Sequence, residues 1–247
     1  MTIVSRESVA RWGLALVCAA TLLGCGRSEY ERRLNATVQV LRTGGAKFPV
    51  PGTPLQLSMP RPNNDPFTLY IESSAEPGTN EPVKPERLQP PFVKLPGFRC
   101  CFEMKRPDDG GGQLTYYCYM AATPAGELGS DGKPMEESIG AQAAAALNAQ
   151  AVTDTVSCPA ADGTSATWQR VTVTAPQSFL GVAGAPPVTI PAVFQLYGHE
   201  IDGWRLIIVW RVPEKISKEI LDMVPGMAGS VAVAPPAAEP AAGAPAN

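Results

Sequence analysis

The chain has 247 residues, with 20 Lys and Arg against 23 Asp and Glu, one histidine and a formal net charge of −3. This mild negative charge, and the lack of any basic cluster, argue against a nucleic-acid binder, because such proteins present basic patches to the phosphate backbone. The length is sufficient for one sizeable domain with flexible segments, or for two small domains.

The N-terminus has the three parts of a secretory signal. Arg6 and Arg11 supply positive charge, and residues 12–23 form an almost uninterrupted apolar run. A run of about 12 residues is well short of the roughly 20 that a helix needs to cross a bilayer. The pattern therefore predicts a cleaved signal peptide over residues 1–24 rather than a permanent transmembrane segment.

A specific motif, Leu22-Leu23-Gly24-Cys25, ends this run. It resembles the lipobox of bacterial lipoproteins, in which a leucine lies three residues before the cysteine and a small residue directly before it. The resemblance implies a diacylglyceryl group on the Cys25 thiol, removal of the signal and acylation of the new amino terminus by a fatty acid such as palmitate. Two or three acyl chains, at about 0.8 kcal/mol per buried CH₂, would anchor the protein stably to a membrane.

The same resemblance bears on the location. Gly26, and not aspartate, follows the cysteine, which favours the periplasmic face of the outer membrane over the inner membrane. The alternative is an ordinary cysteine behind an ordinary cleaved signal, but no A-x-A-like cleavage site lies in better register.

Residues 25–44 carry a helical pattern. Ser28 and Glu31 match a capping box, and apolar residues recur at helical spacing up to Leu41. The pattern predicts an amphipathic helix of about four turns that ends at Gly44. It could contact a membrane or a partner, or pack on its own domain. We favour packing because the polar face mixes positive and negative charges.

Two parts of the chain have a composition that disfavours regular structure. Between Gly44 and Gly97 there are 12 prolines, and proline removes a backbone donor and biases the chain to extended forms. We predict a linker over residues 45–64. Residues 225–247, rich in Ala, Pro and Gly, lack the large apolar side chains that offset ordering entropy, so they are predicted to be a disordered tail.

The remaining residues, 65–224, form the predicted domain, in which period-2 patterns dominate. Strands are expected at residues 67–72, 98–104, 114–120, 167–174, 188–197 and 204–212. Helices are expected at residues 134–151 and 213–224. This order predicts an α+β domain with an antiparallel sheet and packing helices.

Cysteine usage agrees with export. Cys18 leaves with the signal, Cys25 takes the lipid, and four cysteines remain in the domain: Cys100, Cys101, Cys118 and Cys158. In an oxidising compartment, four cysteines suggest two disulfide bonds.

The expected pairing follows from alternation along the strands. The sequence alternates Phe98, Cys100, Phe102 and Met104 on one face, and Cys118 has the matching parity on the next strand. If Lys105 lies opposite Gln113, then Cys100 lies opposite Cys118, which leaves Cys101 for Cys158. A vicinal disulfide between Cys100 and Cys101 is the alternative, disfavoured because neighbouring strand residues point to opposite faces.

Few residues offer chemistry. His199 is the only histidine, which excludes a His-rich metal site and makes any Ser-His-Asp or Cys-His arrangement depend on it. It lies with Glu200 and Asp202 in a predicted hairpin turn, where they could bind a cation or act as acid and base, although turns are commonly polar. Asp108 and Asp109 lack the spacing of a calcium loop. We therefore predict no catalytic residue, no metal and no cofactor.

Aromatic residues offer the other candidate surface. Alternation places Tyr117 and Tyr119 on the face opposite Tyr116, and Trp204 and Trp210 lie on a later strand. Tyr117 and Tyr119 could form an exposed patch for sugars or peptides, or be covered by a helix. We expect them to be covered, because sheets in α+β domains commonly pack against helices.

The sequence thus predicts a non-enzymatic envelope lipoprotein, bound to the membrane through Cys25, whose domain serves binding or assembly with an envelope protein or glycan. One alternative is an envelope hydrolase that uses carboxylates such as Glu200 and Asp202. Another is a carrier of hydrophobic ligands, which would require an apolar cavity. Clustered carboxylates would favour the hydrolase, an apolar cavity the carrier and a flat aromatic patch the binding module.

Overall fold

The computed structural model describes residues 47–60, 65–71, 88–109, 112–160, 163–179 and 186–234. The chain divides into two units, residues 1–46 and 47–247, and all described residues belong to the second. The predicted signal peptide, the lipobox with Cys25, the helix predicted over residues 25–44 and residues 235–247 of the predicted tail lie outside the described residues.

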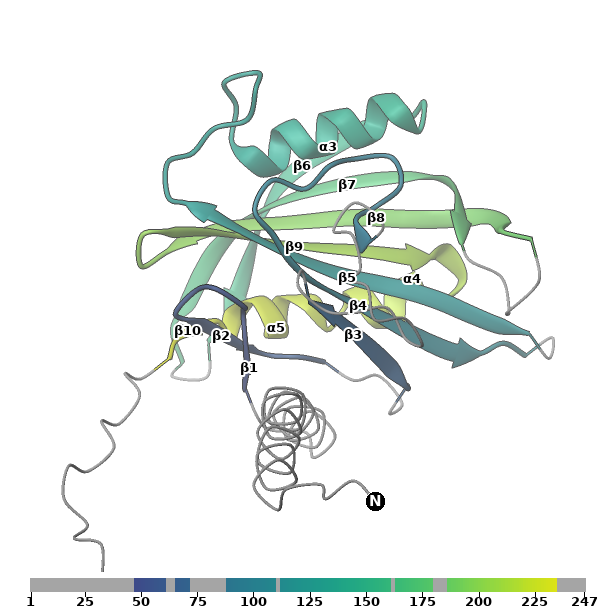
Figure 1. The fold of residues 1–247 in the computed structure, drawn as a ribbon, viewed down its shortest axis with the longest axis horizontal. Coiled ribbons are helices and arrows are strands. Elements are labelled where there is room, and N and C mark those ends of the chain that lie inside the picture. The colour runs from purple at the N-terminus through teal and green to yellow at the C-terminus, as the bar shows by residue number, and fades with distance from the viewer. Residues whose placement is uncertain are drawn as a thin grey trace, which may run out of the picture. The chain divides into compact units, whose positions relative to one another are not determined.

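A seven-stranded sheet forms the centre of the domain, with the strand order β3-β4-β5-β9-β8-β7-β6 (Figure 1). Every neighbouring pair in it is antiparallel. Its strands are β3 Phe67–Ile71, β4 Phe98–Pro107, β5 Gln113–Pro124, β6 Ala151–Pro159, β7 Ser165–Phe179, β8 Val188–Ile201 and β9 Trp204–Pro213. The predicted α+β class with an antiparallel sheet is confirmed, and the fold is dominated by the sheet.

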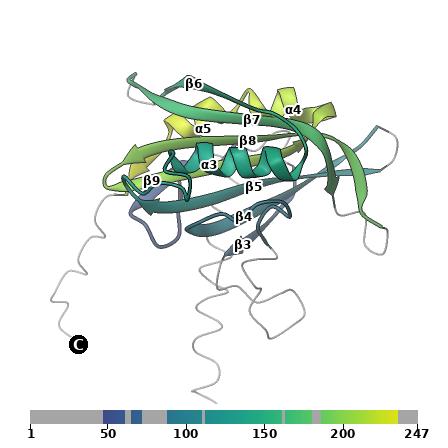
Figure 2. The same ribbon diagram turned by 90° about the horizontal axis from the view of Figure 1, so that it is seen from above.

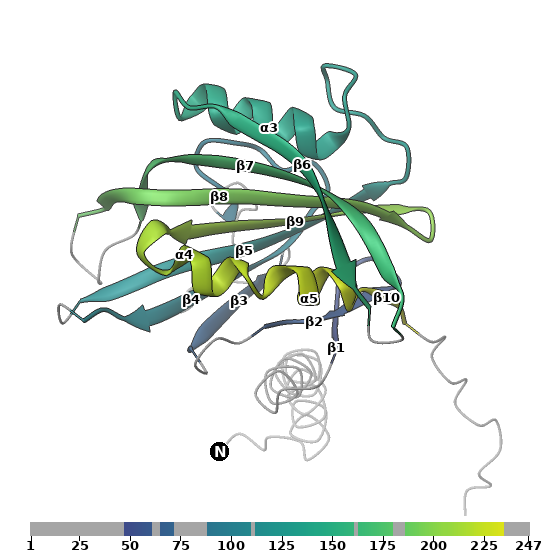
Figure 3. The ribbon, with the colours of Figure 1, turned by 180° about the vertical axis from the view of Figure 1, so that it is seen from behind.

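Helices lie on both sides of this sheet (Figures 2 and 3). Helix α3, Met135–Ala146, contacts β7 and β8 on one face. Helices α4, Glu214–Leu221, and α5, Val224–Gly229, contact strands from the other face. A small antiparallel sheet of β1 Lys47–Pro49, β2 Leu55–Ser58 and β10 Ala232–Val233 adjoins α5.

The central strands explain why two covering layers are needed. Strands β5 and β9 are buried along almost their whole length, so side chains of both parities avoid water. Val171, Phe194 and Val209 join Met135 and Ile139 in the core on the α3 face. The alternate residues point toward α4 and α5. Strands buried on both faces appear in sequence as continuous apolar runs, as in residues 206–210 of β9.

The predicted disulfide bonds are absent from the structure, in which Cys100, Cys101, Cys118 and Cys158 are all free and buried. The predicted register of β4 and β5 is wrong by two residues, because Lys105 lies opposite Thr115. Cys100 therefore lies opposite Met120, diagonal to Cys118 on the same face. Burial raises the pKa of the Cys100, Cys101 and Cys118 thiols, which keeps them protonated.

A pairing of Cys101 with Cys158 conflicts with the topology. Strands β5, β9, β8 and β7 separate β4 from β6 in the sheet. Cys101 belongs to the core on the α3 face, whereas Cys158 shares its parity with Trp168 on the other face. A register shift between Phe98 and Cys100 also corrects the predicted alternation, because it moves Phe98 to the face of Cys101.

The folded unit extends beyond residues 65–224 at both ends. Strands β1 and β2 lie within the predicted linker, and α5 and β10 lie largely within the predicted tail. The helix predicted over residues 134–151 is shorter than expected: α3 ends at Ala146, and Asn148 adopts a positive φ of 50°. Asn tolerates this left-handed geometry, which stops the helix and leads the chain into the unpredicted strand β6.

A buried polar cluster secures α4 to the sheet. Arg106 donates from Nε to Asp65 Oδ2 at 2.9 Å and from Nη1 to Glu219 Oε2 at 2.6 Å. Tyr116 donates its hydroxyl to the same Asp65 oxygen at 2.7 Å. The cluster thus joins β4, β5, α4 and the residues before β3.

Among the described residues, no helix is both long and apolar enough to cross a membrane.

Candidate binding groove

A surface groove of about 360 Å³ lies along the N-terminal part of α3. Three segments form its walls: the chain before β4, the loop between β5 and α3, and α3 itself. Its lining residues are Lys94, Pro96, Glu127, Leu128, Gly129, Ser130, Met135, Ser138, Ile139 and Gln142.

The groove has an apolar floor and a polar rim. Met135 and Ile139 are buried core residues, and they form its base. Leu128, at the edge, is 54% exposed, which is unusual for a large apolar side chain in this domain. Lys94 and Glu127 supply one charge of each sign at the rim. Such a surface can bury an apolar side chain of a ligand, while the two charges orient the polar groups of the ligand beside that side chain.

The loop that carries Leu128 is held against the start of α3. Gly129 donates its backbone N–H to the Lys133 carbonyl at 2.8 Å, and Leu128 forms an isolated antiparallel bridge with Pro134. These contacts fold residues 128–134 back on themselves, immediately before α3 begins at Met135. The position of Leu128 is therefore set by the helix start.

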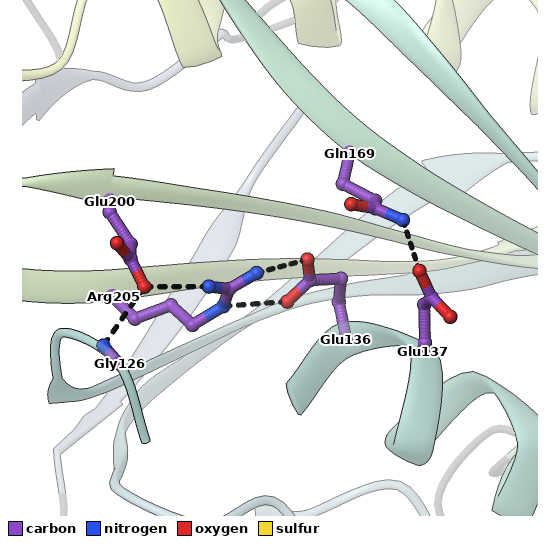
Figure 4. A network of polar contacts seen from close by, with 6 residues as sticks. All are labelled: Gly126, Glu136, Glu137, Gln169, Glu200 and Arg205. Carbon is purple, nitrogen blue, oxygen red and sulfur yellow. Dashed lines mark hydrogen bonds and ion pairs between the residues drawn. The ribbon is translucent and has the colours of Figure 1, made fainter. Parts of the chain in front are cut away.

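Arg205 connects α3 to the β8–β9 hairpin (Figure 4). It donates from Nε to Glu136 Oε2 at 2.8 Å, and from Nη2 to the other Glu136 oxygen. From Nη1 it donates to Glu200 Oε1 at 2.8 Å, and the same oxygen accepts the Gly126 N–H at 2.9 Å. One guanidinium thus joins α3, the hairpin and the β5–α3 loop.

Glu136 is fully buried, with an exposed fraction of 0%. Space for it exists because Gly198 has no side chain: a Cβ there would collide with the Glu136 carboxylate. A buried carboxylate is tolerated only when it is paired and hydrogen-bonded, and the two-pronged guanidinium contact provides both. The first turn of α3 also favours its negative charge. In the same turn, Glu137 accepts a hydrogen bond from Gln169.

Electrostatics follow from these contacts. The Gly126 N–H and then the Arg205 guanidinium lower the pKa of Glu200, so this carboxylate is ionised at neutral pH. The hydrogen bond to Glu136 raises the pKa of Arg205. The Glu200 carboxylate therefore takes part in an ion pair with Arg205 and accepts a hydrogen bond from Gly126.

The hairpin residues proposed as a catalytic or cation site are not brought together. Strand β8 continues to Ile201, and only Asp202 and Gly203 form the turn, with φ of 49° and 75°. Positive φ at both positions is typical of the tight two-residue hairpin turn, which Asp-Gly favours. His199 and Glu200 point to opposite faces of the sheet. His199 instead stacks on Trp168, with ring centroids 4.9 Å apart.

Tyr117 and Tyr119 are buried in the core on the α3 face, as expected for covered aromatics. Tyr117 stacks on Tyr119 and on Phe179, with centroid distances of 5.8 and 6.3 Å. Arg211 lies over the rings of Phe92, Tyr117 and Phe179 at 5.8, 5.4 and 4.3 Å. None of the described ion pairs involves Arg211, so aromatic faces and hydrogen bonds to Gln177 and Ser178 stabilise its charge.

The remaining candidates have structural partners. Tyr116 stacks on Trp210 on the opposite face, and the guanidinium of Arg99 lies over Trp204. Asp108 and Asp109 both form ion pairs with Lys215. Within the described ranges, no group of three or more His, Cys, Asp or Glu side chains is arranged to hold a metal ion.

Sequence reasoning missed Glu136, Arg205 and the groove. Glu136 falls within the helix predicted over residues 134–151, and no local pattern reveals that its side chain meets Arg205, 69 residues later. The available signal was the presence of two arginines, Arg205 and Arg211, in an otherwise apolar strand. No family model matches the chain, and no curated protein is significantly similar to it in sequence.

We predict that Arg205→Leu destabilises the domain by about 3 kcal/mol, because Glu136 would be left buried without a partner. Glu200→Gln is the matched control: the amide oxygen still accepts from Gly126, and Glu200 is half exposed, so stability should change little. Urea unfolding of both variants measures the difference. Equal stability of Arg205→Leu and the unsubstituted protein would show that the pair does not hold the groove.

A second prediction concerns pH. Partial burial lowers the pKa of His199 below its ordinary 6.5, so the unfolded chain binds a proton that the folded chain resists. The folded state is therefore favoured above pH 6.5 and loses stability as the pH falls below it. The drop in melting temperature between about pH 7.5 and about pH 5.5 should be smaller in His199→Gln. An identical drop in both proteins would contradict this assignment.

Proposed function

We propose that the protein is an envelope lipoprotein, anchored through a lipid on Cys25, whose domain binds a protein partner through the groove beside α3. The observation that carries the proposal is the apolar floor of the groove, two of whose walls, α3 and the β5–α3 loop, are linked through Arg205 and Glu200. A preformed site loses little conformational entropy on binding, so even a small apolar contact can contribute affinity.

The chemistry of the groove favours apolar side chains of a polypeptide over a glycan. None of its lining residues is aromatic, whereas sugar binding commonly uses an aromatic ring as a stacking surface. The backbone of a peptide could instead contact the polar rim, where Ser130 and Gln142 offer side-chain hydrogen bonds. Lys94 is the only cation in the lining, so polyanions such as nucleic acids are poorly matched.

Anchoring would confine this groove near a membrane. Lys47, the first described residue, lies 22 positions after Cys25, so even a fully extended connection spans at most about 75 Å. Confinement raises the effective concentration for partners on the same membrane or the adjacent wall, and weak contacts become useful there.

Two alternatives have less support from the geometry. A hydrolase using Glu200 would need this carboxylate free, but it accepts from both Arg205 and Gly126. A carrier would shield its ligand from water, whereas the groove has an exposed rim that includes Leu128 and Gln142. A ligand bound there would retain contact with solvent, so docking of a partner surface fits the groove better.

We expect Cys25→Ser to abolish lipid attachment and to leave the precursor unprocessed or released from the membrane, because the thiol is the attachment point that the lipobox implies. Metabolic labelling with a fatty-acid analogue and membrane fractionation measure both effects. Replacement of Cys101 with serine serves as the control and should leave labelling unchanged. Normal labelling of Cys25→Ser would refute the anchor.

Occupancy of the groove can be tested in cells with the full chain. A photoreactive residue in place of Gln142, on the groove rim, should form covalent adducts with a protein, whereas the same residue in place of Ala145, exposed on α3 but outside the lining, should not. Leu128→Asp should abolish the adducts because it replaces an exposed apolar side chain at the edge of the groove with a charge. Val188→Asp, a similarly exposed aliphatic position on β8, should preserve them.

The possible results of this experiment distinguish the binding module from the carrier. Protein adducts that depend on Leu128 support the binding module. Lipid adducts alone would establish the carrier instead, and equal adducts from positions 142 and 145 would eliminate the groove as the site. Purified Leu128→Asp should retain the melting temperature of the unsubstituted protein, because Leu128 is largely in water.

A further inference from the structure

Strand β6 forms one edge of the main sheet (Figures 2 and 3). It pairs with β7 along nine residues, and no other described strand pairs with it. Residues 151–155 are exposed on both faces, and Val152 is 63% exposed. Helix α5 contacts β6, and Gly229 lies against Pro159 at the end of the strand. Within the described part of the chain, one side of residues 151–156 is open to another strand.

Edge strands usually carry features that prevent pairing with other chains, such as lysine, proline, bulges or unpaired charges. Residues 151–156 have the sequence Ala-Val-Thr-Asp-Thr-Val, with no lysine or proline. Their pairing with β7 proceeds without a register shift. Four of these six residues are β-branched, which favours extended structure and cross-strand packing.

The single charge of this segment is already neutralised. Arg170 on β7 donates from Nε to Asp154 Oδ1 at 2.8 Å and also bonds the second carboxylate oxygen. Because Arg170 lies directly opposite Asp154 in the register, the pair stays within one copy of the chain. The exposed edge thus presents a strand of no net charge and high strand propensity.

The order of side chains along β6 favours a second copy of the same strand as its partner. Residues 152–156 are symmetric, with Val152 and Val156 outside, Thr153 and Thr155 inside and Asp154 at the centre. In an antiparallel pair related by a two-fold axis through Asp154, valine meets valine and threonine meets threonine. Such pairs stabilise a sheet, and the two Asp154 carboxylates that face each other are each paired with their own Arg170.

We propose that two copies of this chain associate through their β6 edges, with residue i opposite residue 308 − i, so that both seven-stranded sheets become one continuous sheet. The contact is small, since one strand edge buries far less than the roughly 1,200 Å² of a stable interface. The dimer therefore dissociates on dilution and forms at high local concentration. The groove beside α3 is not part of this surface.

The dimer can be tested with the full chain in detergent, by light scattering over a range of concentrations. The mass should rise from one chain to two as the protein is concentrated. Thr153→Lys combined with Thr155→Lys should keep the protein monomeric, because four lysines would gather around the axis. Thr174→Lys combined with Thr189→Lys, at exposed threonines of β7 and β8, should dimerise normally.

Cysteine cross-linking tests the register independently of these variants. Under mild oxidation, a mixture of Thr153→Cys and Thr155→Cys chains should yield more linked dimer than either chain alone, because these positions are opposed across the axis. A mixture of Thr174→Cys and Thr189→Cys chains should yield none. A monomer at all concentrations, or a dimer that survives the lysine pair, would overturn the proposal, and so would absence of the mixed cross-link.

Discussion

The need to cover both faces of the central strands determines the rest of this structure. Strands β5 and β9 are apolar at both parities, so each face of the sheet requires its own layer. Helix α3 and the chain before β4 cover one face, while α4, α5 and the small sheet cover the other. Residues 151–155 of β6 are nevertheless exposed on both faces, which leaves this edge of the sheet open.

Two buried ion pairs join separate segments of the domain. Arg205 and Glu136 connect α3 with the hairpin, and Arg106 and Asp65 connect β4 with the segment before β3. In both cases a guanidinium meets a carboxylate in surroundings that exclude most water. Such pairs contribute little net stability compared with apolar packing, but they penalise any other arrangement of the layers. The placement of α3 against the hairpin and the β5–α3 loop is thereby fixed.

Local patterns in the sequence predicted most of the sheet and both longer helices, because alternation and helical spacing depend on neighbouring residues. Strand β6 escaped prediction, since Asn148 ends α3 earlier than the alanine-rich sequence suggests. The disulfide pairing failed for a similar reason. The register of β4 and β5 is fixed by the whole sheet, and a two-residue shift preserves every side-chain face, so alternation could not detect it. The contact of Glu136 with Arg205 depends on tertiary structure alone.

The burial of the domain's thiols has a consequence for their reactivity. The thiolate, and not the thiol, is the nucleophile in alkylation and in disulfide exchange. Cys100, Cys101 and Cys118 are enclosed by packing, and burial raises the pKa of each thiol. A thiol reagent should therefore modify these three cysteines only when the domain opens, so that their labelling reports the opening of the sheet.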